Sequence, residues 1–155
     1  MKYYIAYGSN LSTSQMKTRC PDAVPVGTAI LKDWCLSFRL HATIEPDEGS
    51  EVPVGVWLIS DTDERYLDIY EGYPAYYSKR NMNITMDGFD GQTHDVTAMV
   101  YIMRPDHHIL PPHFTYYSII QEGYNDFGLD DTPLKQALED AITWDSLHTH
   151  GGDMS

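Results

Sequence analysis

The sequence is poor in cysteine and has no long apolar run, and each shortage excludes a class of protein. Its 155 residues include two cysteines, Cys20 and Cys35, too few for the disulfide framework of a small secreted domain. We expect a reduced pair, with one or both packed in the core. No apolar run reaches the ~20 residues of a membrane-spanning helix, and the N-terminus lacks the pattern of a secretory signal. The expected location is therefore cytoplasmic.

Basic residues are also scarce. Ten lysines and arginines stand against 23 aspartates and glutamates, a formal net charge of −13. This charge repels phosphate, so nucleic acid and anionic membranes are disfavoured as partners. Repeats, linkers and low-complexity segments are absent too, and the length suits one core. We expect a single domain over residues 1–155, with a frayed tail at about 148–155.

Short strands and a few helices are predicted along the chain. Apolar, β-branched and aromatic patterns predict strands at residues 3–7, 23–30, 34–40, 52–59, 76–86 and 93–104. Lys32-Asp33 indicates a hairpin turn, and residues 45–50 are predicted to form an acidic loop. Helices are predicted at residues 12–19, 61–71 and 114–122 and from Pro133 onward. The pattern indicates an α+β fold, and we favour a mixed sheet that curls or closes.

One segment near the start is the most informative. It comprises Tyr4, Ile5, Ala6, Tyr7, Gly8, Ser9 and Asn10. An apolar strand ends here in a glycine and two small polar residues, before a short helix. Gly8 lets the backbone approach a ligand closely, and the amides of Ser9 and Asn10 suit a carboxylate or a developing oxyanion. The alternative is a strand end capped by Ser-Asn, without a function.

A second candidate is Glu71, in the last turn of the predicted helix that Gly72 ends. The negative end of the helix dipole disfavours a carboxylate by a few tenths to about 1 kcal/mol. This placement raises the pKa of Glu71 and makes it a better proton acceptor; the alternative is an ordinary surface glutamate. Twelve tyrosines against four phenylalanines suggest rings around a wet pocket. Tyr7, Tyr77 and Tyr116 are candidates, with core filling as the alternative.

Seven histidines raise the alternative of a metal site. The candidates are His107, His108 and His113, with His94 or the tail pair His148 and His150. Neighbouring histidines point in different directions, and the sequence has neither Cys-x-x-Cys nor His-Glu-x-x-His spacing. We therefore expect no bound metal and no cofactor.

Four blocks of the sequence together resemble the gamma-glutamylcyclotransferase family. They are Tyr4 to Leu11, Leu67 to Pro74, Tyr77 with Lys79, and Tyr116 to Gly123 followed by Gly128-Leu129. The blocks occur in the order that the family has. The resemblance implies a small α+β fold with a mixed β-barrel, closed or partly closed, a few packed helices, and a pocket at the barrel mouth.

The resemblance also implies a function. Such enzymes convert a γ-glutamyl compound into 5-oxoproline and an amino acid or amine. It implies that residues 4–9 form the substrate loop, that Glu71 is the catalytic base and that Tyr116 contacts the substrate. Tyr77 lies one residue closer to Glu71 than its counterpart in the human-type enzymes. The Tyr-Gly-Ser-Asn form resembles the branch that acts on γ-glutamyl amino acids. A non-catalytic small-molecule binding protein with the same pocket is the alternative, and the sequence leaves a homodimer open.

Overall fold

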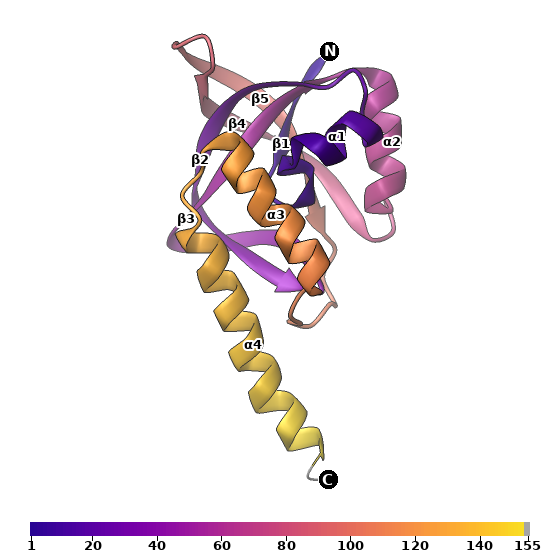
Figure 1. The fold of residues 1–155 in the computed structure, drawn as a ribbon, viewed down its shortest axis with the longest axis vertical. Helices are drawn as coiled ribbons and strands as arrows, with labels where there is room; N and C mark the ends of the chain where they lie inside the picture. Colours follow the sequence, from indigo (N-terminus) through magenta and orange to yellow (C-terminus); the bar gives the residue numbers. More distant parts are fainter. Residues whose placement is uncertain (154–155) are drawn as a thin grey trace.

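The computed structural model describes residues 1–153, without the side chains of 149–153, and its centre is a closed five-stranded barrel (Figure 1). The strands are β1 (Lys2–Ala6), β2 (Val24–Arg39), β3 (His41–Ile59), β4 (Tyr77–Gly88) and β5 (Thr93–Met103). They follow the order β1-β3-β2-β4-β5. β1 pairs antiparallel with β3 and parallel with β5, which makes the sheet mixed and closes it. The predicted α+β class and mixed β-barrel are therefore confirmed.

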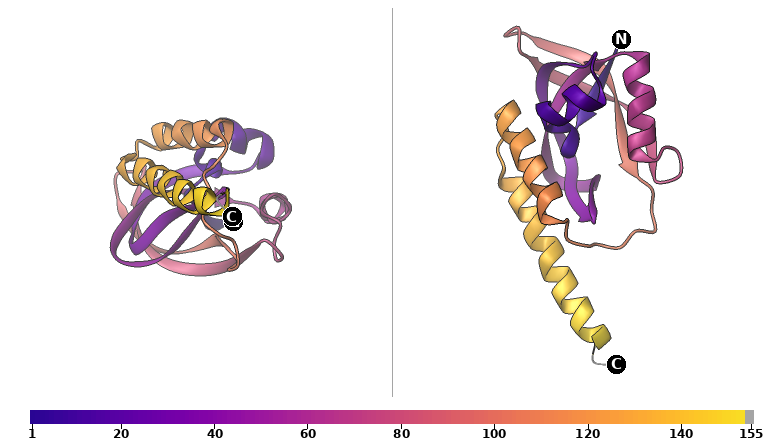
Figure 2. Two further views of the ribbon diagram at one scale, coloured as in Figure 1. Left: turned by 90° about the horizontal axis from the view of Figure 1, so that it is seen from below. Right: turned by 45° about the vertical axis from the view of Figure 1, so that its right-hand side comes forward.

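Helical segments connect the strands and cover the barrel. They are η1 (Ser9–Leu11), α1 (Thr13–Arg19), α2 (Asp61–Glu71), α3 (Phe114–Phe127) and α4 (Thr132–Asp153). Figures 1 and 2 show α3 and the start of α4 against one side of the barrel, with α2 beside another and the end of α4 projecting away. Of the helices described, none is long and apolar enough to cross a membrane.

The hairpin of β2 and β3 differs from the prediction. β2 is one long strand, and the turn lies at Leu40 instead of at Lys32-Asp33. Asp33 has a positive φ of 67° and interrupts the register, so the turn-forming residues make a β-bulge that bends the strand. The segment predicted as an acidic loop belongs to β3, where Glu45 pairs with Cys35.

The two C-terminal helices also extend beyond their predicted ends. α3 continues through Gly123 and ends at Gly128. A Cβ atom on Gly123 would lie 2.4 Å from the Cβ of Leu11, so this glycine lets α3 pack closely on η1 and does not end the helix. α4 begins at Thr132, one residue before the predicted start, and continues to Asp153, past the predicted onset of fraying at residue 148. Residues 154–155 lie outside the described residues.

Helix α2 begins and ends as the sequence predicts. The Ser60 hydroxyl accepts a hydrogen bond from the Asp63 amide at 3.0 Å, and the Asp63 carboxylate accepts one from the Ser60 amide at 3.2 Å. This capping box fixes the first turn, and Gly72, at a φ of 63°, ends the helix. The buried residues of α2 are Asp63 and Leu67, so this helix lacks a broad apolar face.

Candidate active site

A cavity of about 380 Å³ lies where η1, the C-terminal end of α2 and the start of β3 meet. This volume suits a small molecule. Seven of the twelve tyrosines line it: Tyr4, Tyr7, Tyr70, Tyr76, Tyr77, Tyr101 and Tyr116. Glu71 is the one carboxylic acid among the lining residues. In the described part of the chain, neither a lysine nor an arginine lines the cavity.

The turn after β1 forms one wall of the cavity. Its first hydrogen bond runs from the Leu11 amide to the Gly8 carbonyl at 3.0 Å. The first N–H groups of such a turn have no acceptor inside it and can therefore bind a ligand. A Cβ atom on Gly8 would lie 3.3 Å from the Cβ of Ala42 and 3.6 Å from the hydroxyl of Tyr116. Glycine therefore keeps space open between the turn and Tyr116.

Glu71, the last residue of α2, lines the same cavity. Its Oε1 accepts a hydrogen bond from Asn10 Nδ2 at 3.3 Å, and the same amide donates to the Tyr4 hydroxyl at 2.9 Å. Burial raises the pKa of Glu71 to about 7, and the Arg19 guanidinium opposes this rise. The sequence correctly indicated a raised pKa, but its main physical cause is burial rather than the helix dipole. A carboxyl group with this pKa can both accept and return a proton near neutral pH.

Arg19, at the end of α1, supports this arrangement from outside the cavity wall. Its guanidinium donates a hydrogen bond to Asn10 Oδ1. The carbonyl end of the Asn10 amide is thereby engaged, so the amino end faces Glu71. Arg19 also stacks on Tyr70, with Cζ 3.5 Å from the ring centroid, and the Tyr70 hydroxyl lies 2.8 Å from Ser9 Oγ. Arg19 therefore connects α1, η1 and α2.

The hydroxyl groups of the cavity tyrosines have different hydrogen-bonding roles. Tyr7 donates to the Tyr101 carbonyl and Tyr77 donates to the Ala42 carbonyl, both at 2.7 Å. Tyr116 instead accepts from the Ala42 amide at 3.0 Å, so its own proton can be donated to a ligand. Burial raises the pKa of Tyr7, Tyr77 and Tyr116 above the ordinary tyrosine value. All three are therefore neutral donors at physiological pH.

A family model described as gamma-glutamyl cyclotransferase, AIG2-like, matches residues 4–119, which is well over half of the chain. The chain belongs to this family. Two gamma-glutamylcyclotransferases, from Bos taurus and Mus musculus, are 30% and 31% identical over 138 residues, covering 81% of this chain and 71% of each relative. A solved gamma-glutamyl cyclotransferase structure superimposes with a TM-score of 0.74 at 28% identity, covering 89% of this chain and 86% of that one.

The structure brings most of the residues proposed from the cyclotransferase resemblance into one cavity. They are Tyr4, Tyr7, Gly8, Ser9, Asn10, Glu71, Tyr77 and Tyr116. Ile5 and Ala6 do not line it: each is 1% exposed and belongs to the core behind the wall. Their place in a substrate loop stays a prediction. With their side chains in the core, they could contact a substrate only through backbone groups.

Sequence reasoning did not propose seven of the lining residues. Three are Ala42, Ile69 and Gly72, and the other four have polar or aromatic side chains: His41, Tyr70, Tyr76 and Tyr101. The excess of tyrosine in the sequence was a signal for the three tyrosines, but it did not show which of the twelve rings line the cavity. His41 carried no signal, because it enters the cavity through the β2–β3 turn, which the sequence placed elsewhere. Burial, with a smaller contribution from His113, lowers the pKa of His41.

Three of the histidines considered as a metal site have separate surroundings, and His150 lies outside the residues whose side chains the structure describes. His94 lies 2.8 Å from a carboxylate oxygen of Asp90 at the β4–β5 turn. His107 packs on Tyr76 and His108 on Trp144, with ring centroids 4.7 and 6.3 Å apart. Among the described residues no cluster of three ligand-type side chains forms, so the metal hypothesis gains no geometric support.

Both cysteines are free thiols. Cys20 is buried in the core, as expected, and Cys35 is partly exposed on β2. Burial raises the pKa of Cys20 to about 12 and that of Cys35 to about 11. Neither thiol therefore ionises near neutral pH, which makes both poor nucleophiles.

Proposed function

We propose that the protein converts γ-glutamyl amino acids into 5-oxoproline and a free amino acid. Membership of the family supports cyclotransferase activity in general; the product and the leaving group are our proposal. The observation that carries it is the Glu71 carboxylate, which lines one cavity together with the Gly8 turn and the Tyr116 hydroxyl.

The proposed reaction is intramolecular. The α-amine of the substrate attacks its own γ-carbonyl, closing a five-membered ring and expelling the amino acid. Because nucleophile and electrophile share one molecule, the protein has to supply mainly orientation and proton transfer. The α-ammonium group, with a pKa of roughly 8, must first lose a proton. Glu71 accepts this proton and passes it to the leaving nitrogen, while the attacking nitrogen loses a second proton after ring closure, which the released amino group takes up.

The other groups bind and orient the substrate. The backbone amides at Gly8 and Ser9 are proposed to hold the α-carboxylate or the oxyanion that forms on the γ-carbonyl. Tyr116 donates a hydrogen bond from the opposite wall. The tyrosine rings shape the cavity and exclude water, which strengthens the polar contacts inside it. Each of these steps uses groups of the chain and of the substrate.

The test is a substrate panel with 5-oxoproline as the readout. The purified protein is incubated with γ-glutamyl-alanine, with a γ-glutamyl-lysine-type amine and with glutathione, beside the Glu71→Gln variant. We expect γ-glutamyl-alanine to be the preferred substrate and turnover to fall by roughly 10²-fold or more in the variant. Undiminished turnover in the variant would remove Glu71 from its role. Binding of the panel without any 5-oxoproline would favour a non-catalytic binding protein.

A further inference from the structure

The face of α2 that meets the barrel is acidic. Glu64 and Asp68 lie one helical turn apart on this face, beside the buried Leu67, and their side chains are 16% and 27% exposed. Two further side chains of α2, Ile69, which also lines the cavity, and Tyr66, are largely solvent-exposed, at 78% and 49%. Leu67 is the one buried apolar side chain of α2, so polar contacts share in holding the helix in position.

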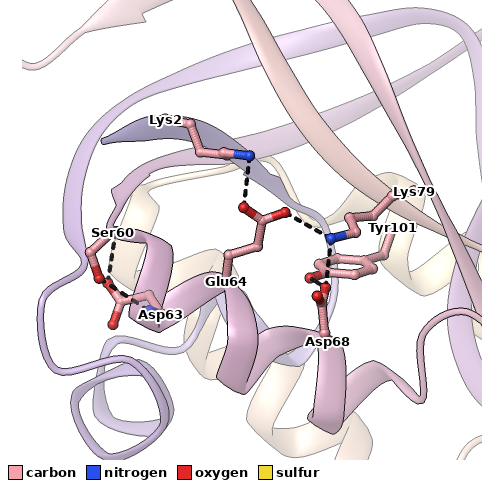
Figure 3. Close-up of polar contacts among 7 residues, drawn as sticks. All are labelled: Lys2, Ser60, Asp63, Glu64, Asp68, Lys79 and Tyr101. Atoms are coloured by element: carbon pink, nitrogen blue, oxygen red, sulfur yellow. Dashed lines mark hydrogen bonds and ion pairs between the residues drawn. The ribbon is translucent and has the colours of Figure 1, made fainter.

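A network of four such contacts joins α2 to the barrel (Figure 3). Lys79 Nζ of β4 lies 2.7 Å from Glu64 Oε2 and 2.8 Å from Asp68 Oδ1. Lys2 Nζ of β1 lies 2.7 Å from Glu64 Oε1. The Tyr101 hydroxyl of β5 donates to Asp68 Oδ1 at 2.6 Å. Figure 3 shows both carboxylates pointing from α2 toward Lys79, which is the centre of the network.

The strand register connects this network to the cavity. Lys79 and Tyr101 are directly paired across β4 and β5, which is why both reach Asp68. Tyr101 also lines the cavity, and its carbonyl accepts the hydrogen bond from Tyr7. Burial alone would lower the pKa of Lys79, but its hydrogen bonds to Asp68 and Glu64 raise it. The lysine is thus fully charged and its bonds are of the strong, charge-assisted kind.

We propose that Lys79 is a positioning residue that sets the depth of Glu71 in the cavity. Asp68 and Glu71 are three residues apart on α2 and therefore move together when the helix slides or rotates. Lys79 holds Asp68 against the barrel and so holds Glu71 at the cavity wall. The catalytic part of this inference depends on the proposed function; the structural part does not.

The test substitutes Lys79→Met, which removes the charge and keeps the length of the side chain. Lys79→Arg is the conservative variant. Arg65→Met is the matched control, because Arg65 is an exposed cation on the same helix whose guanidinium donates a hydrogen bond to Thr62, also on α2. The first readout needs no substrate: an NMR titration of the Glu71 side-chain carboxyl carbon, assigned with Glu71→Gln.

The direction in which the pKa of Glu71 changes distinguishes a positioning role of Lys79 from a direct electrostatic effect of its charge. If α2 moves away from the barrel, Glu71 becomes more exposed and its pKa falls from about 7 toward the ordinary 4.5. Direct loss of a nearby cation would raise it instead. The groups facing Glu71 from other elements stay unchanged in every variant. They are Arg19, Asn10, Tyr4, Tyr7, Tyr76, Tyr77 and Tyr116.

We expect the pKa of Glu71 to fall in Lys79→Met and to be retained in Lys79→Arg and Arg65→Met. With γ-glutamyl-alanine, kcat should fall roughly 10-fold or more with little change in KM, and the acid limb of the pH profile should move to lower pH. An unchanged or raised pKa in Lys79→Met would overturn the inference. If that variant does not fold, Asp68→Asn gives the same test with Lys79 and Glu64 still paired. Absence of turnover in the unmodified protein would refute the proposed function and leave the titration valid.

Discussion

Replacing Glu71 with glutamine should stabilise the protein in a way that depends on pH. Burial raises the pKa of Glu71 from an ordinary 4.5 to about 7. Between these two values the folded state binds more protons than the unfolded state, so the free energy of unfolding falls as pH rises. The cost of burying the carboxylate is absent below pH 4.5 and fully present above pH 7. Glutamine is neutral and carries no such cost.

The size of the effect follows from the two pKa values. At about 1.4 kcal/mol per pH unit, the difference between 4.5 and about 7 corresponds to about 3 kcal/mol at pH 8. At pH 5 it is below about 1 kcal/mol. Asn10 Nδ2 can donate to the glutamine oxygen as it does to Glu71 Oε1, so the variant keeps this hydrogen bond.

The assay is urea unfolding of the native protein and of Glu71→Gln at pH 5 and pH 8. We expect the variant to be more stable at pH 8 by about 3 kcal/mol, with nearly equal stabilities at pH 5. A control substitution of an exposed acid, Asp61→Asn, should show no comparable pH dependence. A stability difference of the same size at both pH values would refute the burial of an ionised Glu71. The same variant should lose activity, which is the usual cost of a strained catalytic site.

Three further changes test neighbouring parts of the site. Arg19→Met removes the cation that lowers the pKa of Glu71, so the acid limb of kcat/KM should move to higher pH in a pH–rate profile. Tyr116→Phe leaves the Ala42 amide without its acceptor and removes one hydrogen-bond donor from the cavity, so kcat/KM should fall about 10-fold in steady-state kinetics. Gly123→Ala places a methyl group against the η1 turn, so urea unfolding should show a loss of about 1–3 kcal/mol.

Local signals in the sequence predicted the parts of the fold that local chemistry determines. Ser60 and Gly72 mark the ends of α2 because a capping box and a left-handed glycine act within a few residues. The β2–β3 hairpin was placed wrongly because Asp33 has the chemistry of a turn but is used in a bulge. Which use prevails depends on pairing with β3 along its whole length, and no local pattern contains that information.

Some residues of the candidate site could likewise be predicted from local motifs, and others could not. Gly8 and Glu71 could be proposed from the sequence because each belongs to a short motif beside a helix end. Lys79 could be noticed but not interpreted: its partners Glu64 and Asp68 are on another element, and only the register of β4 and β5 brings them together. Long-range polar contacts of this kind require the assembled barrel.

In the proposed mechanism the neutral wall of the cavity matters as much as the carboxylate on it. An ammonium group beside Glu71 lowers the pKa of the carboxyl and raises its own. The bound pair therefore starts as ions, and the proton has to move against this preference. Burial among tyrosines disfavours both charges, because neutral groups lose less hydration free energy than ions on leaving water. It therefore reduces the free-energy difference between the ion pair and the neutral pair of amine and carboxylic acid. Substitutions that admit water, such as Tyr77→Ala, should thus stabilise the bound ion pair against proton transfer. We expect kcat to fall by a larger factor than KM rises.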